Sequence, residues 1–141
     1  MTQNVLLPVD PDEKASWERA LPIAVEEAKQ RNATLHVLTV VPSFGSSIVA
    51  SYFPKDFSEK ATSDAERQLD ALIKSEVPAG MKTERHVAHG RIHQEIVRVA
   101  KGINVDLIVM ASHKPDWSDS FLTPNAAQVL HHAPMSVLVV R

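Results

Sequence analysis

The chain contains no cysteine, which excludes disulfide bonds, thiolate metal sites and cysteine nucleophiles. It also lacks a block of basic residues: fifteen Lys and Arg stand against seventeen Asp and Glu, for a formal net charge of −2. Because proteins that bind nucleic acid neutralise phosphates with clustered Lys and Arg, we expect no nucleic acid partner. No stretch approaches the roughly 20 apolar residues that cross a bilayer, and no charged segment leads into an apolar core at the N-terminus. These absences predict a cytoplasmic protein without a membrane partner.

Catalytic motifs are missing as well. The sequence has no G-x-S-x-G elbow, and no pair of carboxylates falls at a shared strand end for acid–base work. We therefore expect a protein that is not an enzyme.

The composition is that of an ordinary globular chain. Its 141 residues are 44% hydrophobic and 23% charged, and low-complexity runs are absent. A chain of this length can bury most of the surface that its unfolded form exposes. We expect a single domain over residues 1–141.

Short apolar runs alternate with helical patterns along the chain. Apolar residues at spacings of three and four predict amphipathic helices at about residues 16–28, 55–75, 92–100 and 125–133. Apolar, β-branched runs predict strands at residues 5–9, 34–41, 82–88, 107–111 and 136–140.

Several residues bear on where these elements begin and end. Pro22 falls inside the first helix and predicts either a kink or a first turn close to Ser16. Lys101 and Gly102 together close the third helix as a C-terminal cap would, and Thr123 before Pro124 is typical of an N-cap followed by proline. The polar strand at 82–88 is typical of a sheet edge.

Strands that alternate with helices at this spacing require right-handed crossovers and a parallel sheet. The predicted fold is a doubly wound α/β domain, with a five-stranded parallel sheet of order 3-2-1-4-5 and helices on both faces. In such sheets a ligand binds beyond the carboxyl ends of the strands where the winding reverses. That point lies between the strands that end near Asp10 and Ala111.

Three segments carry a family resemblance: LLPVD near the start, LHVLTVVPS after the first helix, and LIVMASHKPD followed by NAAQVLHHAPMSVLVVR at the end. With them the whole chain resembles the universal stress protein family, and its tail looks like that of the UspF-type bacterial members. The resemblance implies a homodimer and, as in many members, an adenine nucleotide such as ATP or AMP at the switch point. It implies no metal beyond a Mg²⁺ ion that accompanies the nucleotide, and slow ATP hydrolysis is the one activity that it leaves open.

Members that bind nucleotides carry G-x-x-G, nine residues, then G-[ST], glycines that let backbone N–H groups approach phosphates. The matching positions here are Ala111, Lys114, Pro124 and Asn125, so the spacing is kept and every motif residue is changed. Pro124 removes a backbone donor, whereas Asn125 and Ala126 keep N–H groups at a helix N-terminus. We expect the phosphate half of the site to be weakened.

The adenosine half matches the family better. Asp10 corresponds to the acidic residue that hydrogen-bonds the nucleotide, and Val40 and Met110 correspond to positions that flank the adenine. Lys114 and His113 offer side-chain donors to a phosphate. The residues assigned to the nucleotide site are Pro8, Val9, Asp10, Val40, Met110, Ala111, Ser112, His113, Lys114, Pro124, Asn125 and Ala126.

Each assignment has a structural alternative. Asp10 is also a good residue to cap the first helix, and Val40 and Met110 are also ordinary core residues. His113 and Lys114 are also ordinary solvated loop residues. The sequence leaves these alternatives open.

The histidines give little support for a metal. His131 and His132 are adjacent on a helix and point in different directions, so they do not chelate one ion. His89 and His93 have an i, i+4 spacing, but Gly90 argues against a helix that includes both, and we expect no metal site at His86, His89 and His93.

The last strand is apolar and falls at a sheet edge in the predicted order, and such an edge invites pairing with another chain. The predicted dimer interface consists of Val137, Leu138, Val139 and Val140.

The sequence leaves two functions open. In the first, the protein is a dimeric stress-response protein that binds an adenine nucleotide between strands one and four. In the second, nucleotide binding is lost, and the protein is a dimeric interaction module that works through contacts with an unidentified protein.

Overall fold

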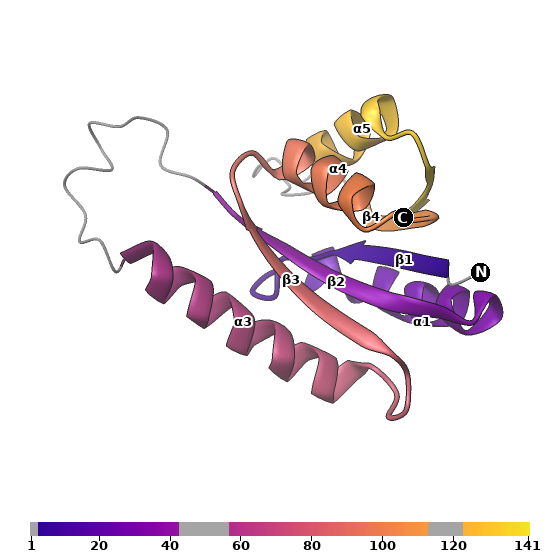
Figure 1. Ribbon diagram of the computed structural model, residues 1–141, viewed down its shortest axis with the longest axis horizontal. Helices are drawn as coiled ribbons and strands as arrows, with labels where there is room; N and C mark the ends of the chain where they lie inside the picture. The colour runs from indigo at the N-terminus through magenta and orange to yellow at the C-terminus, as the bar shows by residue number, and fades with distance from the viewer. Residues whose placement is uncertain (1–2, 43–56, 113–122) are drawn as a thin grey trace.

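The computed structural model describes residues 3–42, 57–112 and 123–141, which form a parallel sheet between two layers of helices (Figure 1). All pairings between neighbouring strands are parallel, and the order is β3-β2-β1-β4-β5. The predicted fold class is confirmed. The strands are β1 (Gln3–Pro8), β2 (Ala33–Val41), β3 (Thr83–His89), β4 (Leu107–Ala111) and β5 (Ser136–Val140).

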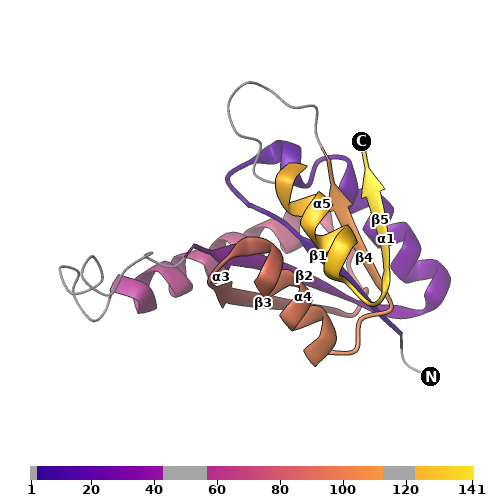
Figure 2. The ribbon, with the colours of Figure 1, turned by 90° about the horizontal axis from the view of Figure 1, so that it is seen from above.

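The helices lie on both faces of the sheet. Helices α1 and α3 cover one face, and α4 and α5 cover the other, as the view from above also shows (Figure 2). The described residues also form one short 3₁₀ helix, η1, after β1. The bounds are η1 (Lys14–Ser16), α1 (Ala20–Arg31), α3 (Phe57–Glu76), α4 (Ile92–Gly102) and α5 (Thr123–His132).

The first helix begins after Ser16, where the sequence predicts its first turn as the alternative to a kink at Pro22. The segment at Ser16 forms the 3₁₀ turn, and α1 begins at Ala20, which places Pro22 in the first helical turn. Amide groups in that turn have no carbonyl partner within the helix, so proline removes no helical hydrogen bond there. Neither a kink nor a helix from Ser16 is needed.

The end of α4 also differs from the prediction. Gly102 is the last helical residue, and the left-handed conformation falls two residues later on Asn104, with φ of 55°. The amide of Val105 donates to Ala100 O at 2.9 Å, and the amide of Asn104 donates to Lys101 O at 3.3 Å. This is the hydrogen-bond pattern of a Schellman cap with asparagine in place of glycine.

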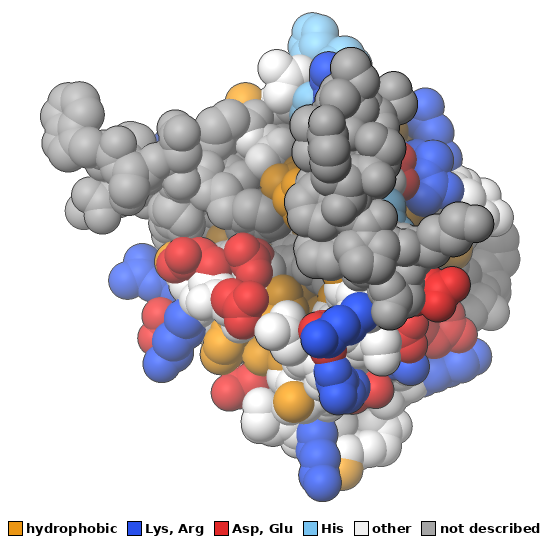
Figure 3. Space-filling view, turned by 90° about the vertical axis from the view of Figure 1, so that its left-hand side faces the viewer, with side chains coloured by type: hydrophobic (Ala, Val, Ile, Leu, Met, Phe, Trp, Pro, Cys, Tyr) orange, Lys and Arg blue, Asp and Glu red, His pale blue; other side chains and the backbone are white. Residues whose placement is uncertain are grey.

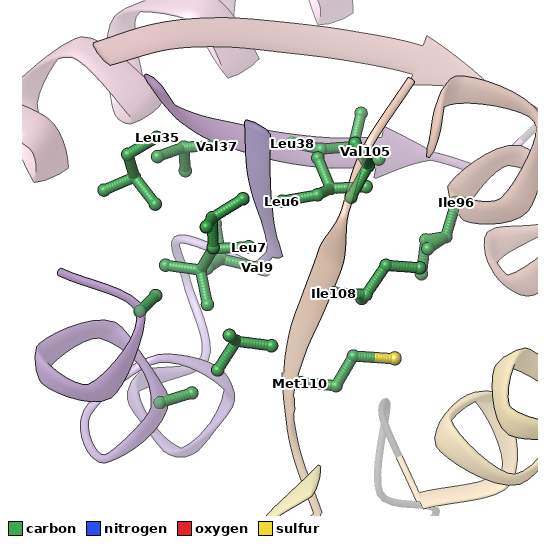
Figure 4. Close-up of a cluster of buried hydrophobic side chains, with 14 of the residues drawn as sticks. Leu6, Leu7, Val9, Leu35, Val37, Leu38, Ile96, Val105, Ile108 and Met110 are labelled. Atoms are coloured by element: carbon green, nitrogen blue, oxygen red, sulfur yellow. The ribbon is translucent and has the colours of Figure 1, made fainter. Parts of the chain in front are cut away.

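Strands β1, β2 and β4 are buried on both faces, which explains their continuous apolar runs. Figure 4 shows two groups of core side chains: Leu7 and Val9 point toward α1, whereas Ile108 and Met110 point toward α4 and α5. The polar strand β3 lies at one edge, as predicted, and β5 lies at the other. Within the described residues, no helix is long and apolar enough to span a membrane.

Candidate functional site

The candidate site lies at the carboxyl edge of the sheet, where the winding reverses. Chain order runs outward from β1 through β2 to β3 on one side, and from β4 to β5 on the other, and β1 pairs directly with β4. The ends of these two neighbours bring Asp10 and Ala111 to the same edge, as the sequence predicts. Figure 3 views the molecule from this end, where charged side chains of both signs lie around hydrophobic atoms.

A buried serine fixes the turn that follows β1. The Asp10 amide donates to Ser16 Oγ at 2.9 Å, and the Ser16 hydroxyl donates back to Asp10 O at 2.8 Å. The same carbonyl accepts the Glu13 amide at 2.9 Å. Ser16 is fully buried, so its hydroxyl holds the backbone of Asp10 against the core. Sequence reasoning missed this role of Ser16, since a lone serine after an apolar run carries no distinctive signal.

The side chain of Asp10 is half-buried and does not cap a helix. The N-cap residues of η1 and α1 are Glu13 and Arg19, and neither cap uses a side chain. Instead, Asp10 Oδ1 accepts the amide of Asp12 at 3.1 Å, which closes a local turn. Burial raises the pKa of Asp10, and the hydrogen bond from Asp12 opposes that rise. Among the described residues, no group donates a hydrogen bond to Asp10 Oδ2.

The apolar residues assigned to the site belong to the hydrophobic core. Val9, Met110 and Ala111 have at most 3% of their surface exposed, Val40 has 6%, and Pro8 is buried at the end of β1. This burial agrees with the alternative that Val40 and Met110 are core residues. A bound ring would lie over the outer end of this core rather than inside it.

The phosphate half of the site has few backbone donors. The Ser112 amide donates to Val140 O at 2.7 Å, so it is already used to hold β4 against β5. Helix α5 begins at Thr123, one residue before Pro124 and not after a Thr123 N-cap as predicted. Asn125 and the buried Ala126 lie in the first turn of this helix. The predicted contacts of His113 and Lys114 lie outside the described residues.

The outer face of β5 is the predicted dimer interface. Val137, Leu138 and Val139 are partly exposed, whereas Val140 is 9% exposed. The strand pairs with β4 on one side only within the described part of the chain. The interface itself stays a prediction.

The structure separates His89 from His93, as the sequence predicts, and brings His36 next to His86. His89 ends β3 and lies 2.6 Å from Thr62 Oγ1, and Gly90, with φ of 141°, separates it from α4. His93 therefore does not share a helix with His89, as argued above. His36 on β2, which the sequence analysis did not single out, instead lies against His86 and Glu84 of β3. This trio depends on the register between two strands, and a single sequence does not give that register.

The comparisons with known proteins agree with this fold. The model of the universal stress protein family matches residues 1–141. The chain is 30% identical over 146 residues to universal stress protein G of Salmonella typhimurium, with both chains fully covered.

Among solved structures, the chain is similar to universal stress protein UspA from Lactobacillus plantarum, with 25% identity, a TM-score of 0.72, and coverage of 99% of this chain and 97% of that one. The same fold occurs in a universal stress protein in complex with cAMP (17% identity, TM-score 0.63, coverage 99% and 97%). It also occurs in the Archaeoglobus fulgidus protein in complex with dAMP (21% identity, TM-score 0.66, coverage 100% and 98%). A family match over the whole chain, together with the predicted strand order, shows that this protein belongs to the universal stress protein family.

Proposed function

We propose that this protein is a stress-response protein that binds an adenine nucleotide, ATP or AMP, weakly between the carboxyl ends of β1 and β4. The observation that carries the proposal is the half-buried Asp10 carboxylate at the switch point of the sheet, with Oδ1 held by the Asp12 amide. Ribose hydroxyls are suitable donors to the second oxygen. Two solved structures with this fold are described as complexes with cAMP and dAMP, which supports an adenine nucleotide as the ligand class.

The weakness of binding follows from the phosphate half. Pro124 has no N–H group, the Ser112 amide is already used by Val140, and Ala111 carries a methyl group where the family motif has glycine. The start of α5, where Asn125 and Ala126 lie, keeps the partial positive charge of a helix N-terminus, which still favours a phosphate. Affinity should therefore depend little on the number of phosphates.

The same residues argue against a catalytic role. A hydrolase needs a base that activates water beside the γ-phosphate. We propose no carboxylate or histidine of the described residues as that base. We propose a cytoplasmic binding protein that works as a homodimer, in which Mg²⁺ accompanies the nucleotide only.

Calorimetry of the full-length protein with ATP, ADP and AMP tests this proposal. We expect Kd values in the high micromolar to millimolar range that differ by less than about tenfold among the three ligands, which corresponds to about 1.4 kcal/mol. Asp10→Asn should weaken all three by a similar factor. Asp12→Asn is the matched control, because it changes an exposed carboxylate in the same turn. Absence of binding at millimolar ligand, or an equal loss in both variants, would reject the site.

A second experiment separates the two halves of the site. The double substitution Pro124→Gly and Asn125→Ser restores two residues of the family motif and one backbone donor. ATP affinity should rise by about tenfold or more while AMP affinity changes less, since a hydrogen bond to a charged group contributes about 1.5–3 kcal/mol. An unchanged ATP affinity would contradict our account of the phosphate half.

The alternative function is a dimeric interaction module that does not bind nucleotide. The changed motif at Ala111 and Pro124 and the partly exposed apolar strand β5 favour it. The two functions differ in the first calorimetric titration: the module predicts no heat with any nucleotide and a dimer that forms equally well without one.

A further inference from the structure

A second polar cluster lies on the sheet, away from the carboxyl edge. His36 of β2 is directly opposite Glu84 of β3, and His86 lies two residues further along β3. Because side chains alternate between faces along a strand, all three point to the same face. One ligand atom from each lies within 4.8 Å of the others. The cluster shares no residue with the candidate nucleotide site.

Asn4 of β1 fixes the orientation of His36. The Asn4 Nδ2 group donates to Ile103 O at 3.2 Å and to Asn104 O at 3.4 Å, so both of its hydrogens face carbonyl groups. Its Oδ1 must then be the atom that lies 2.9 Å from His36 Nε2. An amide oxygen only accepts hydrogen bonds, so Nε2 of His36 carries the proton.

The other nitrogen of His36 therefore presents a lone pair to the cluster. His36 Nδ1 lies 2.8 Å from His86 Nε2 and 3.4 Å from Glu84 Oε2. A neutral imidazole with the proton on Nε2 has none to share with a carboxylate at Nδ1. His36 Nδ1, His86 Nε2 and a Glu84 carboxylate oxygen therefore face one another. At most one hydrogen, on His86 Nε2, lies among these three atoms, and a bound cation would interact favourably with all of them.

Burial favours the neutral form of both imidazoles. The His36 side chain is 5% exposed, and burial is the largest cause that lowers its pKa; the neighbouring His86 and Lys82 act in the same direction, and Glu84 opposes them. Burial also lowers the pKa of His86, again against Glu84. Neutral imidazole is the form that binds metals, so this burial acts in favour of a metal ion.

The cluster is also accessible. The Glu84 side chain is 54% exposed, and His86 lines an open hollow of about 550 Å³ beside the edge strand, together with Val99 and Ile103. Two nitrogens bound to one tetrahedral zinc ion stand about 3.3 Å apart, given Zn–N distances near 2.0–2.1 Å. His86 on the edge strand would have to move by about half an ångström.

We propose that His36 Nδ1, His86 Nε2 and the Glu84 carboxylate bind one divalent transition-metal ion of the zinc class, with water in the fourth position. Two imidazoles and one carboxylate form a donor set typical of zinc sites that keep an open position. On binding, His86 moves its proton from Nε2 to Nδ1, so that Nε2 becomes a ligand. Asn4 acts as the hydrogen-bonded partner that orients the buried ligand, as is usual for metal-binding histidines.

The test uses tag-free, full-length protein, with Co²⁺ as a spectroscopic probe and Zn²⁺ for calorimetry. One equivalent of Co²⁺ should give the visible absorption of a tetrahedral site, and Zn²⁺ should displace it. His86→Asn and Glu84→Gln should each weaken Zn²⁺ binding by at least about tenfold, and Asn4→Ala by about 10- to 100-fold. If His86→Asn does not fold, Glu84→Gln, at an exposed position, still decides the question.

His89→Asn is the matched control, because His89 lies on the same strand, points to the other face and contacts Thr62 of α3. His132→Asn removes the stacked pair that His132 forms with His93, at 6.3 Å between ring centroids, as an alternative site. Both variants should bind Zn²⁺ like the unmodified chain. Absence of stoichiometric binding, or equal binding by His86→Asn, Glu84→Gln and the controls, would overturn the proposal in favour of a hydrogen-bonded histidine pair.

A nuclear magnetic resonance measurement gives a readout that does not depend on affinity. Long-range ¹H–¹⁵N spectra of the metal-free protein should show His36 protonated at Nε2. Addition of Zn²⁺ should shift the Nδ1 resonance of His36 and the Nε2 resonance of His86 and leave those of His89 in place. Protonation of His36 at Nδ1 in the metal-free protein would contradict the orientation argued from Asn4.

Discussion

The two edge strands of the sheet have opposite character. Strand β3 forms the edge on the β2–β3 side of β1, and β5 forms the edge on the β4–β5 side. On β3, Arg85 forms ion pairs with Glu66 at 2.5 Å and with Asp70 at 2.7 Å, both on α3. On β5, the partly exposed residues are Val137, Leu138 and Val139. Charged side chains on an edge strand discourage pairing with another chain, whereas an apolar edge invites it. The two edges of one sheet therefore differ in how strongly their side chains discourage pairing with another chain.

The largest expected effect is on association. Leu138→Lys places a charge on β5 and should convert a dimer into a monomer at micromolar concentration, because a buried unpaired charge is costly at an interface. Val87→Lys is the matched change on β3 and should leave the association state unchanged. Sedimentation velocity reads the outcome, with circular dichroism to confirm the fold. A dimer that survives Leu138→Lys and dissociates with Val87→Lys would reverse the comparison.

The next effect is on stability. Leu69 of α3 is fully buried in the core beneath the β2–β3 side, and Val129 of α5 is fully buried on the β4–β5 side. Leu69→Ala should lower the free energy of unfolding by about 2–5 kcal/mol, and Val129→Ala by less, because less side-chain volume is removed. Urea denaturation measures both. A larger loss from Val129→Ala would show that the β4–β5 side is the more tightly packed one.

The smallest effect concerns the seam between the two sides, at Asp10. Burial raises its pKa in the folded protein above the value of 3.8 that it has when unfolded. The folded state therefore favours the protonated form, and stability falls as pH rises from about 3.8 through the folded pKa. Asp10→Asn should raise the melting temperature only slightly at pH 7, since the half-exposed group is screened by solvent. Below pH 3.8 the substitution should have no such effect, because the carboxyl group is then protonated in the folded and the unfolded state. A lower melting temperature at pH 7 would show that the hydrogen bond from Asp12 outweighs burial.

Much of the fold follows from the sequence because its signals are local. The runs at β4 and β5 coincide with the observed strands to the residue, and the polar composition of β3 correctly indicates an edge. The start of α1 and the role of Asn104 were missed because both depend on which of several suitable residues adopts the turn. The position of the candidate site could be predicted, since strand order alone determines where the winding reverses.

The cluster of His36, Glu84 and His86 could not be predicted from local patterns. His36 interrupts an apolar strand and is indistinguishable there from an isolated core histidine. Its neighbours are determined by the parallel register that sets His36 opposite Glu84. The orienting contact from Asn4 joins residues 32 positions apart, and register of this kind is a property of the assembled sheet.

The contacts between Asn4 and Asp106 can form only late in the synthesis of the chain. The backbone amide of Asn4 donates to Asp106 Oδ2 at 2.7 Å, and the backbone carbonyl of Asn4 accepts the Asp106 backbone amide at 2.9 Å. On the ribosome, β1 is synthesised about a hundred residues before its second neighbour β4. Until then a central apolar strand has one open side, and closing so long a loop is slow. The part of the nascent chain that precedes β4 should therefore depend on chaperones until residues 107–111 have left the exit tunnel.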